Sequence, residues 1–134
     1  MKNFFIIDGI KHYIPEEAYH LCTAQKAILV DVREEYMGRY KQFDVPEVIY
    51  CPLSLLYTVF DDLPRDRLLI FADAAGLHSK EAVHFLSDKG FRKIANLAGG
   101  LVEWEQDHMP LKIDKSERLT GSCMCMLRKR EKNK

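Results

Sequence analysis

Short apolar runs alternate with amphipathic segments along most of the chain. Runs rich in apolar and branched residues predict buried strands, which fall at residues 27–32, 48–50, 68–72 and 93–97. Periodic apolar positions and helix-start signals predict helices around these strands, at residues 15–23, 33–40, 55–60, 80–89 and 99–104. Strands that alternate with helices at this spacing indicate an α/β domain with a mainly parallel sheet.

Turn and cap residues mark where several of these elements begin. Asp8 and Gly9 separate two apolar runs within residues 4–14, which predicts a β-hairpin. We expect Ser54 and Ser79 to cap the helices that follow them, because a serine hydroxyl can accept a hydrogen bond from an N–H group of the first helical turn.

The size and charge of the chain narrow the classes of protein to consider. A chain of 134 residues and 15.6 kDa predicts one domain. Its 20 basic residues balance its 20 acidic residues, which argues against a surface built to hold nucleic acid. Residues 128–134 carry five basic residues and one acidic residue, and we expect this basic tail to give only non-specific affinity for nucleic acid.

No apolar run approaches the roughly 20 residues that span a bilayer, so we expect no membrane partner. The apolar run at residues 4–7 is too short for the hydrophobic region of a signal peptide. Without an export signal, the four cysteines are expected to be reduced thiols and the protein to be cytoplasmic.

The most informative segment is the loop that follows the predicted strand at residues 68–72. It reads D-A-A-G-L-H-S. In parallel α/β sheets, ligands bind outside the carboxyl ends of the strands. A loop of small residues before a helix can turn successive backbone N–H groups inward and form a cradle for an anion. An ordinary turn between strand and helix is the simpler alternative. The candidate cradle comprises Asp73, Ala74, Ala75, Gly76, Leu77, His78 and Ser79.

Four segments, taken together and in order, resemble the rhodanese family. Residues 29–34 (LVDVRE) are similar to the L-[IV]-D-V-R start of that domain, and residues 68–79 are similar to its strand and active loop. Residues 96–104 (NLAGGLVEW) resemble its N-L-x-G-G-[IL]-x-x-W ending, and residues 14–17 (IPEE) resemble its I-[ST]-P-E-E opening. The resemblance implies a single-domain rhodanese-like fold, in which helices flank a parallel sheet on both faces.

The same resemblance implies a division of the chain. We expect an N-terminal hairpin extension at residues 1–12, a rhodanese-like domain at residues 13–111 and a basic tail with two cysteines at residues 112–134. Asp31 and Arg33 match the framework pair that the family places near its loop. A strand-end aspartate can accept N–H groups there, and an arginine can pair with a carboxylate.

The rhodanese resemblance also implies a chemistry, and one residue departs from it. Rhodaneses are thiosulfate sulfurtransferases, which carry sulfur as a persulfide on the cysteine that leads a loop of the form C-x-x-G-x-[RT]-[SA]. This sequence keeps Gly76 and Ser79, but it has Asp73 at the cysteine position and His78 at the usual basic position. A carboxylate cannot form a persulfide. We predict that the Asp73 carboxylate turns into the loop and accepts the N–H bonds that a persulfide would have taken.

Other roles for the loop side chains have less support. Catalysis by Asp73 as a general base or phosphoryl acceptor would need a paired carboxylate, a phosphate-binding lysine or a metal cluster, and none lies beside it in the sequence. His78 either contacts a ligand at the mouth of the loop or is simply an exposed residue at the start of the helix.

Two further cysteines, Cys123 and Cys125, lie beyond the segment that resembles the family. The cations at residues 128–130 favour thiolate, so this pair is the best alternative nucleophile in the chain. The pair could instead hold a soft metal with ligands from Cys22, Cys51 or a second chain, or it could form part of an apolar patch. The tail is long enough to bring these thiols back to the loop. We expect Cys22 and Cys51 to be core residues.

Three functional hypotheses follow. The first is a rhodanese-like domain without catalysis at the loop, which serves as a binding or regulatory module with a protein partner or sulfur donor as its ligand. The second is a sulfurtransferase or sulfur and redox carrier that uses Cys123 and Cys125. The third is an enzyme that the substitution at residue 73 has disabled. None of the three implies a cofactor.

Overall fold

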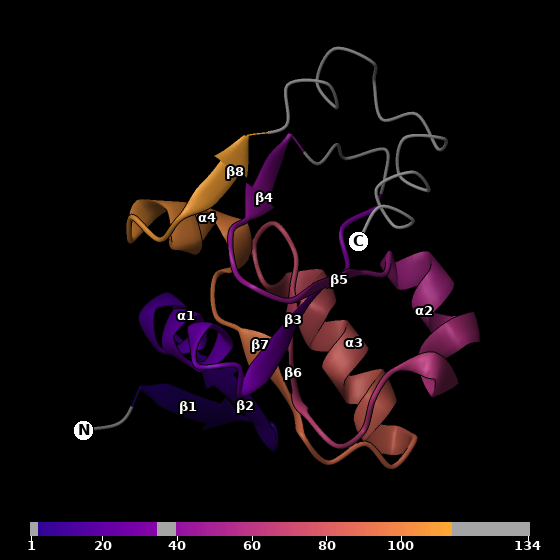
Figure 1. Ribbon diagram of the computed structural model, residues 1–134. Helices are drawn as coiled ribbons and strands as arrows, with labels where there is room; N and C mark the ends of the chain where they lie inside the picture. Colours follow the sequence, from indigo (N-terminus) through magenta and orange to yellow (C-terminus); the bar gives the residue numbers. More distant parts are fainter. Residues whose placement is uncertain (1–2, 35–39, 114–134) are drawn as a thin grey trace.

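A six-stranded, mostly parallel sheet runs through the centre of the molecule (Figure 1). The computed structural model describes residues 3–34 and 40–113. In spatial order the strands are β1 (Phe4–Ile7), β2 (Ile10–Tyr13), β7 (Ile94–Leu97), β6 (Leu68–Ala72), β3 (Ala27–Asp31) and β5 (Val48–Tyr50). The β1–β2 pair is antiparallel and the other neighbouring strands are parallel. The predicted α/β class is confirmed.

Helices cover both faces of this sheet, as the family resemblance implied. On one face lie α1 (Pro15–Thr23) and α4 (Gly100–Gln106); on the other lie α2 (Leu53–Val59), the short 3₁₀ helix η2 (Phe60–Asp62) and α3 (Leu77–Asp88). None of the helices in the described ranges is long and apolar enough to cross a membrane.

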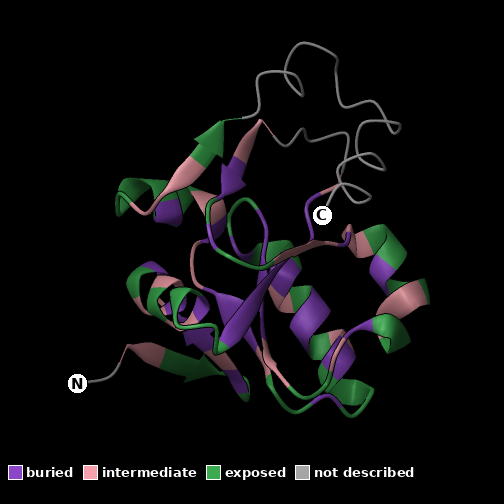
Figure 2. Ribbon diagram, viewed as in Figure 1, coloured by how far each residue is buried: buried purple, intermediate pink, exposed green. Residues whose placement is uncertain are grey.

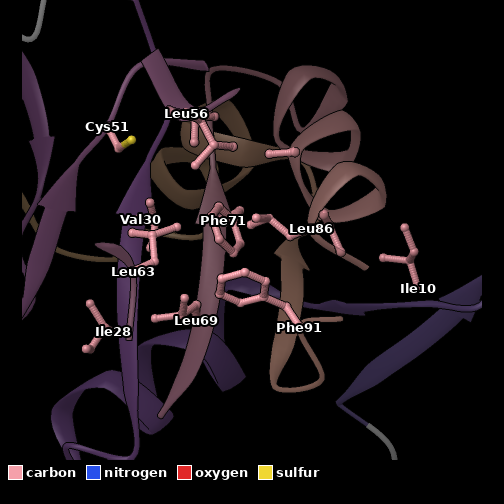
Figure 3. Close-up of a cluster of buried hydrophobic side chains, with 13 residues drawn as sticks. Ile10, Ile28, Val30, Cys51, Leu56, Leu63, Leu69, Phe71, Leu86 and Phe91 are labelled. Atoms are coloured by element: carbon pink, nitrogen blue, oxygen red, sulfur yellow. The ribbon is translucent and has the colours of Figure 1, made fainter. Parts of the chain in front are cut away.

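The central strands are buried on both faces, which explains why they read as continuous apolar runs (Figure 2). Successive side chains point to opposite faces, so Val30 and Phe71 pack with Leu86 of α3 in one core (Figure 3). Leu29 and Ile70 pack in the second core, whose residues include Trp104 of α4. These two cores hold α3 and α4 at fixed positions around the carboxyl end of β6.

The predicted N-terminal hairpin is confirmed. Asp8 and Gly9 connect β1 to β2 with positive φ angles of 54° and 77°. This backbone conformation matches the twist of a two-residue hairpin turn, and glycine and aspartate tolerate it better than most residues. Strand β2 then pairs in parallel with β7, opposite Asn96 and Leu97.

Two predicted helix caps are wrong. Helix α2 begins at Leu53, and both the N–H and the hydroxyl of Ser54 donate to the Glu34 carboxylate, at 2.8 and 2.9 Å. Helix α3 begins at residue 77, so Ser79 lies inside its first turn, where its hydroxyl faces the Asp73 carboxylate. In both helices a carboxylate that precedes the helix bonds the first turn. Glu34 is 20 residues from Ser54 and cannot be identified as its partner from the local sequence, whereas Asp73 lies in the loop directly before α3.

A second sheet was not predicted. Strand β4 (Lys41–Phe43) pairs antiparallel with β8 (Leu111–Ile113), and each has only three residues, too few for a readable period. The helix expected over residues 33–40 falls largely on residues 35–39, which lie outside the described residues; residues 33, 34 and 40 are not helical.

Candidate functional site

The candidate loop lies at the carboxyl end of β6, where the sheet and two helices meet. The first turn of α4 donates to its backbone: the N–H of Leu101 bonds the Asp73 carbonyl at 2.9 Å, and that of Val102 bonds the Ala74 carbonyl at 3.0 Å. At Gly100 a Cβ atom would come within 2.5 Å of the Asp73 carbonyl oxygen. The approach of α4 to the loop therefore requires glycine at residue 100.

The Asp73 side chain points into the loop and is nearly fully buried, with 5% of its surface exposed. Its Oδ1 accepts hydrogen bonds from the Gly76 N–H and from the Ser79 hydroxyl, the latter at 3.2 Å. Its Oδ2 accepts a hydrogen bond from the His78 N–H at 2.9 Å. The predicted direction of the carboxylate is confirmed. The negative charge occupies the place that the inward N–H groups would offer to an anion.

His78 lies at the mouth of the loop. Its Nδ1 is 3.6 Å from Asp73 Oδ2, and 58% of the side chain is exposed. A neutral imidazole adds no charge, whereas a protonated one forms an ion pair with the carboxylate. The structure agrees with the interpretation of His78 as an exposed residue at the start of the helix. The alternative, a contact between His78 and a ligand, stays a prediction.

A buried polar chain leads away from the loop toward β2. The Ser79 hydroxyl lies 2.5 Å from Asn96 Oδ1 on β7, and the Asn96 amide nitrogen lies 3.1 Å from Nδ1 of His12 on β2. The same amide nitrogen donates to the Gly76 carbonyl at 3.4 Å. Because a hydroxyl carries one proton, Ser79 can donate to Asp73 or to Asn96, but not to both at once.

His12 ends this chain in an apolar setting. It is 4% exposed and stacks on Phe5, with ring centroids 5.0 Å apart and ring planes inclined by 7°. Its Nε2 is buried and has no hydrogen-bond partner within the described part of the chain. Burial, together with the nearby charges of Lys80 and His84, lowers the pKa of His12 below its usual value. The folded structure therefore favours a neutral His12.

Sequence reasoning missed both members of this chain beyond the loop. Asn96 was noticed only as the first residue of the N-L-x-G-G motif, and His12 carried no signal, since 84 residues separate the two. One signal could have identified Asn96: it is a polar residue within a predicted interior strand, where every side chain is expected to be buried.

Asp31 and Arg33 form a buried ion pair at the end of β3. Arg33 Nη2 lies 2.8 Å from Asp31 Oδ2, and the two side chains are 5% and 0% exposed. The same Nη2 donates to the Lys41 carbonyl at 2.9 Å, while the Arg33 N–H bonds Asp31 Oδ1. The pair thus joins β3 to β4 next to the loop. This arrangement suits the framework role that the resemblance implied.

The two cysteines in the described part of the chain lie in the hydrophobic cores and not in the candidate loop. Cys22 on α1 and Cys51 after β5 are buried in the two different cores. Burial raises the pKa of the Cys22 thiol to about 12. Across residues 3–34 and 40–113, no three His, Cys, Asp or Glu side chains are grouped to hold a metal. Cys123 and Cys125 lie outside the described residues.

The sequence matches the rhodanese-like domain family over residues 14–107. The chain therefore belongs to that family. It is 25% identical over 91 residues to a protein named sulfurtransferase from Allochromatium vinosum, which covers 68% of this chain and 83% of the relative. The fold is similar to the crystal structure of a rhodanese-related protein from Thermoplasma volcanium, with a TM-score of 0.65, 25% identity, and coverage of 77% of this chain and 98% of that one.

A third similarity concerns a larger protein. A NAD-dependent persulfide reductase from A. fulgidus matches 58% of this chain with 32% identity and a TM-score of 0.52, and the match spans only 14% of the reductase. A rhodanese-like fold thus occurs as one part of a larger redox enzyme.

Proposed function

We propose that this rhodanese-like domain is a binding or regulatory module, and that Asp73 stands where sulfur-carrying members of the family have their loop cysteine. The observation that carries the proposal is the buried Asp73 carboxylate, which accepts the N–H groups of Gly76 and His78. These donors would otherwise be available to a persulfide or an anionic donor. The loop keeps its shape and loses the means to hold sulfur.

The charge of Asp73, like the hydrogen bonds that it accepts, opposes the binding of an anionic sulfur donor in the loop. Two like charges about 4 Å apart repel by roughly 4 kcal/mol at an effective dielectric of about 20. Thiosulfate approaching the loop would meet the Asp73 carboxylate at short range. His78, at the position where the family usually has a basic residue, is exposed at the mouth of the loop, with Nδ1 3.6 Å from Asp73 Oδ2.

Sulfur loading of the reduced full-length chain tests the proposal. The protein is incubated with thiosulfate beside a rhodanese that loads, and each cysteine peptide is weighed by mass spectrometry. In the Cys123→Ser, Cys125→Ser double variant we expect no sulfur adduct, because Cys22 and Cys51 are buried. Adding Asp73→Cys to that variant should create an adduct at position 73. Loading or transfer by the double variant itself would overturn the proposal.

A sulfur or redox carrier that uses Cys123 and Cys125 is the second candidate. It is favoured by the cations at residues 128–130 and by the relative named sulfurtransferase. An adduct confined to these two thiols in the unmodified chain would select it. A metal at the same pair would need further ligands, and Cys22 and Cys51, buried in opposite cores, are poorly placed to supply them together.

The proposed organisation of the chain is a hairpin extension at residues 1–12, a rhodanese-like domain at residues 13–111 and a tail at residues 112–134. The expected ligand is a protein partner or a sulfur donor. The rhodanese-like part of the A. fulgidus persulfide reductase gives one example in which the partner is joined to the domain in the same chain.

A further inference from the structure

Exposed apolar side chains lie in the candidate loop and in the first turn of α4. Leu77 and Val102 are 66% and 52% exposed, and Ala74 and Ala75 between β6 and α3 are exposed as well. The hydrogen bond from the Val102 N–H to the Ala74 carbonyl holds the two segments together. We call this surface the loop face, and define it by Ala74, Ala75, Leu77, Val102, Glu103 and Asp107. Exposed apolar side chains from two segments that are bonded to each other are a candidate interaction site.

The charge of the loop face is negative. Residues 73–79 and 94–111, which supply the loop and α4, contain no lysine or arginine. Glu103 and Asp107 are both exposed on or next to α4. The nearby Glu105 is paired with Lys41 at 2.8 Å. An occupant of this face should therefore combine apolar side chains with positive charge.

The chain leaves its described part next to this face. Ile113, at the end of β8, lies opposite Lys41 of β4. The Lys41 side chain bonds Glu105 of α4, and its carbonyl accepts a hydrogen bond from Arg33 at the end of β3. Residue 113 is thus tied to α4 and to the end of the sheet that carries the loop, and Figure 1 shows β8 at this end of the molecule.

The following segment has the required chemistry and sufficient length. Residues 123–130 read CMCMLRKR, an apolar stretch followed by three cations. Cys123 is ten residues beyond Ile113, which allows a reach of about 33 Å at ~3.3 Å per extended residue. The radius of gyration of a domain of about 100 residues is only about 13 Å. The loop face is therefore within reach in the same molecule.

We propose that residues 123–130 cover the loop face of their own chain, with the apolar stretch on Leu77 and Val102 and the cations near Glu103 and Asp107. The inference rests on the proposed function, in which the domain is a binding or regulatory module, and it adds the surface and the segment that occupies it. It also brings Cys123 and Cys125 beside the Asp73 loop. A partner that binds the loop face would then have to displace the tail, and by doing so would expose both thiols.

A nitroxide label on Cys123 of the full-length Cys125→Ser chain tests this placement. Cys22 and Cys51 are buried, so the label should attach at residue 123 alone. We expect the amide NMR signals of residues 74–78 and 100–107 to weaken by about twofold or more relative to the reduced label, because the tether keeps the tail at a high local concentration. The amides of β1 should keep their intensity. Equal weakening across the domain, or none, would overturn the proposal.

Two comparisons, one between variants and one between salt concentrations, test whether the loop face itself binds the tail. Leu77→Glu with Val102→Glu should abolish the local weakening, whereas Ile6→Glu, on a side chain that is 61% exposed on β1, should preserve it. Roughly 1 M salt, at which the Debye length is about 3 Å, should reduce the effect. Weakening that survives the double variant would show that the loop face is not the docking surface.

A mixed sample distinguishes docking of the tail on its own chain from docking on a second copy of the protein. Isotope-labelled protein without a nitroxide is mixed with unlabelled protein that carries one, and we expect no local weakening. Weakening in the mixture would place the tail on another molecule and overturn the proposal. Failure of the proposed function would be seen separately, as sulfur loading of the Cys123→Ser, Cys125→Ser variant, which does not depend on where the tail lies.

Discussion

Asp73 combines two properties in a single side chain: it fills the loop and it stabilises the start of α3. Its carboxylate accepts the N–H groups of Gly76 and His78, which have no earlier helical carbonyl to bond. A negative charge at this end of a helix is also favoured by the helix dipole. Asp73, whose carboxylate cannot itself carry a persulfide, therefore contributes to folding as well.

Replacing this carboxylate should destabilise the domain. We expect Asp73→Ala to lower the free energy of unfolding by about 2 kcal/mol, because it leaves buried N–H donors without a partner. Urea denaturation followed by circular dichroism measures the change. Asp61→Ala is the matched control, since Asp61 is exposed and its ion pair with Arg65 spans 3.4 Å; it should cost less than about 1 kcal/mol. Equal losses in the two variants would contradict the role of Asp73.

His12 should make stability depend on pH. Because burial lowers its pKa in the folded chain, the unfolded chain binds a proton more readily, beginning near the ordinary value of about 6.5. Stability from this residue is present above that pH and is lost as the pH falls below it. Urea titrations at about pH 7.5 and about pH 5.5 should show a smaller loss for His12→Gln than for the unmodified chain. A loss of the same size in both proteins would refute the assignment.

Among the secondary-structure elements, the junction of the loop with α4 depends on close backbone contact. Gly99 and Gly100 have φ angles of 75° and 60°, and the turn that they form allows α4 to donate to the loop carbonyls. The contact fixes Asp73 and Ala74 relative to the sheet. Packing of the buried Trp104 in the second core holds α4 in place behind the loop.

Gly100→Ala should therefore disrupt the junction. The new Cβ would lie 2.5 Å from the Asp73 carbonyl oxygen, in a backbone conformation that is already unfavourable for alanine. We expect a loss of about 3 kcal/mol or more in thermal or urea unfolding. Gly9→Ala provides the control, because its φ is 77° but nothing lies within 4 Å of the added Cβ. It should cost only about 1 kcal/mol, and a similar cost at residue 100 would show that the contact is not tight.

For the whole molecule, secondary structure was most predictable from the sequence where consecutive residues are all buried. The strands β3 and β6 were readable because both of their faces are covered, and the Asp8–Gly9 turn was readable because few residue pairs adopt its backbone conformation. The loop was found because it follows β6 and matches a family pattern. The three-residue strands β4 and β8 carry no comparable signal in their residues.

The parts of the site that were missed depend on contacts between distant segments. His12 meets Asn96 only after β2 and β7 have paired, and Glu34 bonds Ser54 across a separation of 20 residues. The serines at residues 54 and 79 have the chemistry of helix caps, yet neither hydroxyl caps its helix: Ser54 donates to Glu34, and the Ser79 hydroxyl faces Asp73 and Asn96. Local preference predicted the bounds of α1 but not the hydrogen-bond partners in the first turns of α2 and α3.

The most direct test of the central claim is to ask whether Asp73 itself keeps an anion out of the loop. Thiosulfate is titrated into the unmodified chain and into Asp73→Ala, and the amide NMR signals of Gly76 and His78 are followed. We expect these signals to shift with saturation only in the variant, whose N–H groups are no longer bonded by the carboxylate. Saturable binding by the unmodified chain, or no response in either protein, would contradict the claim.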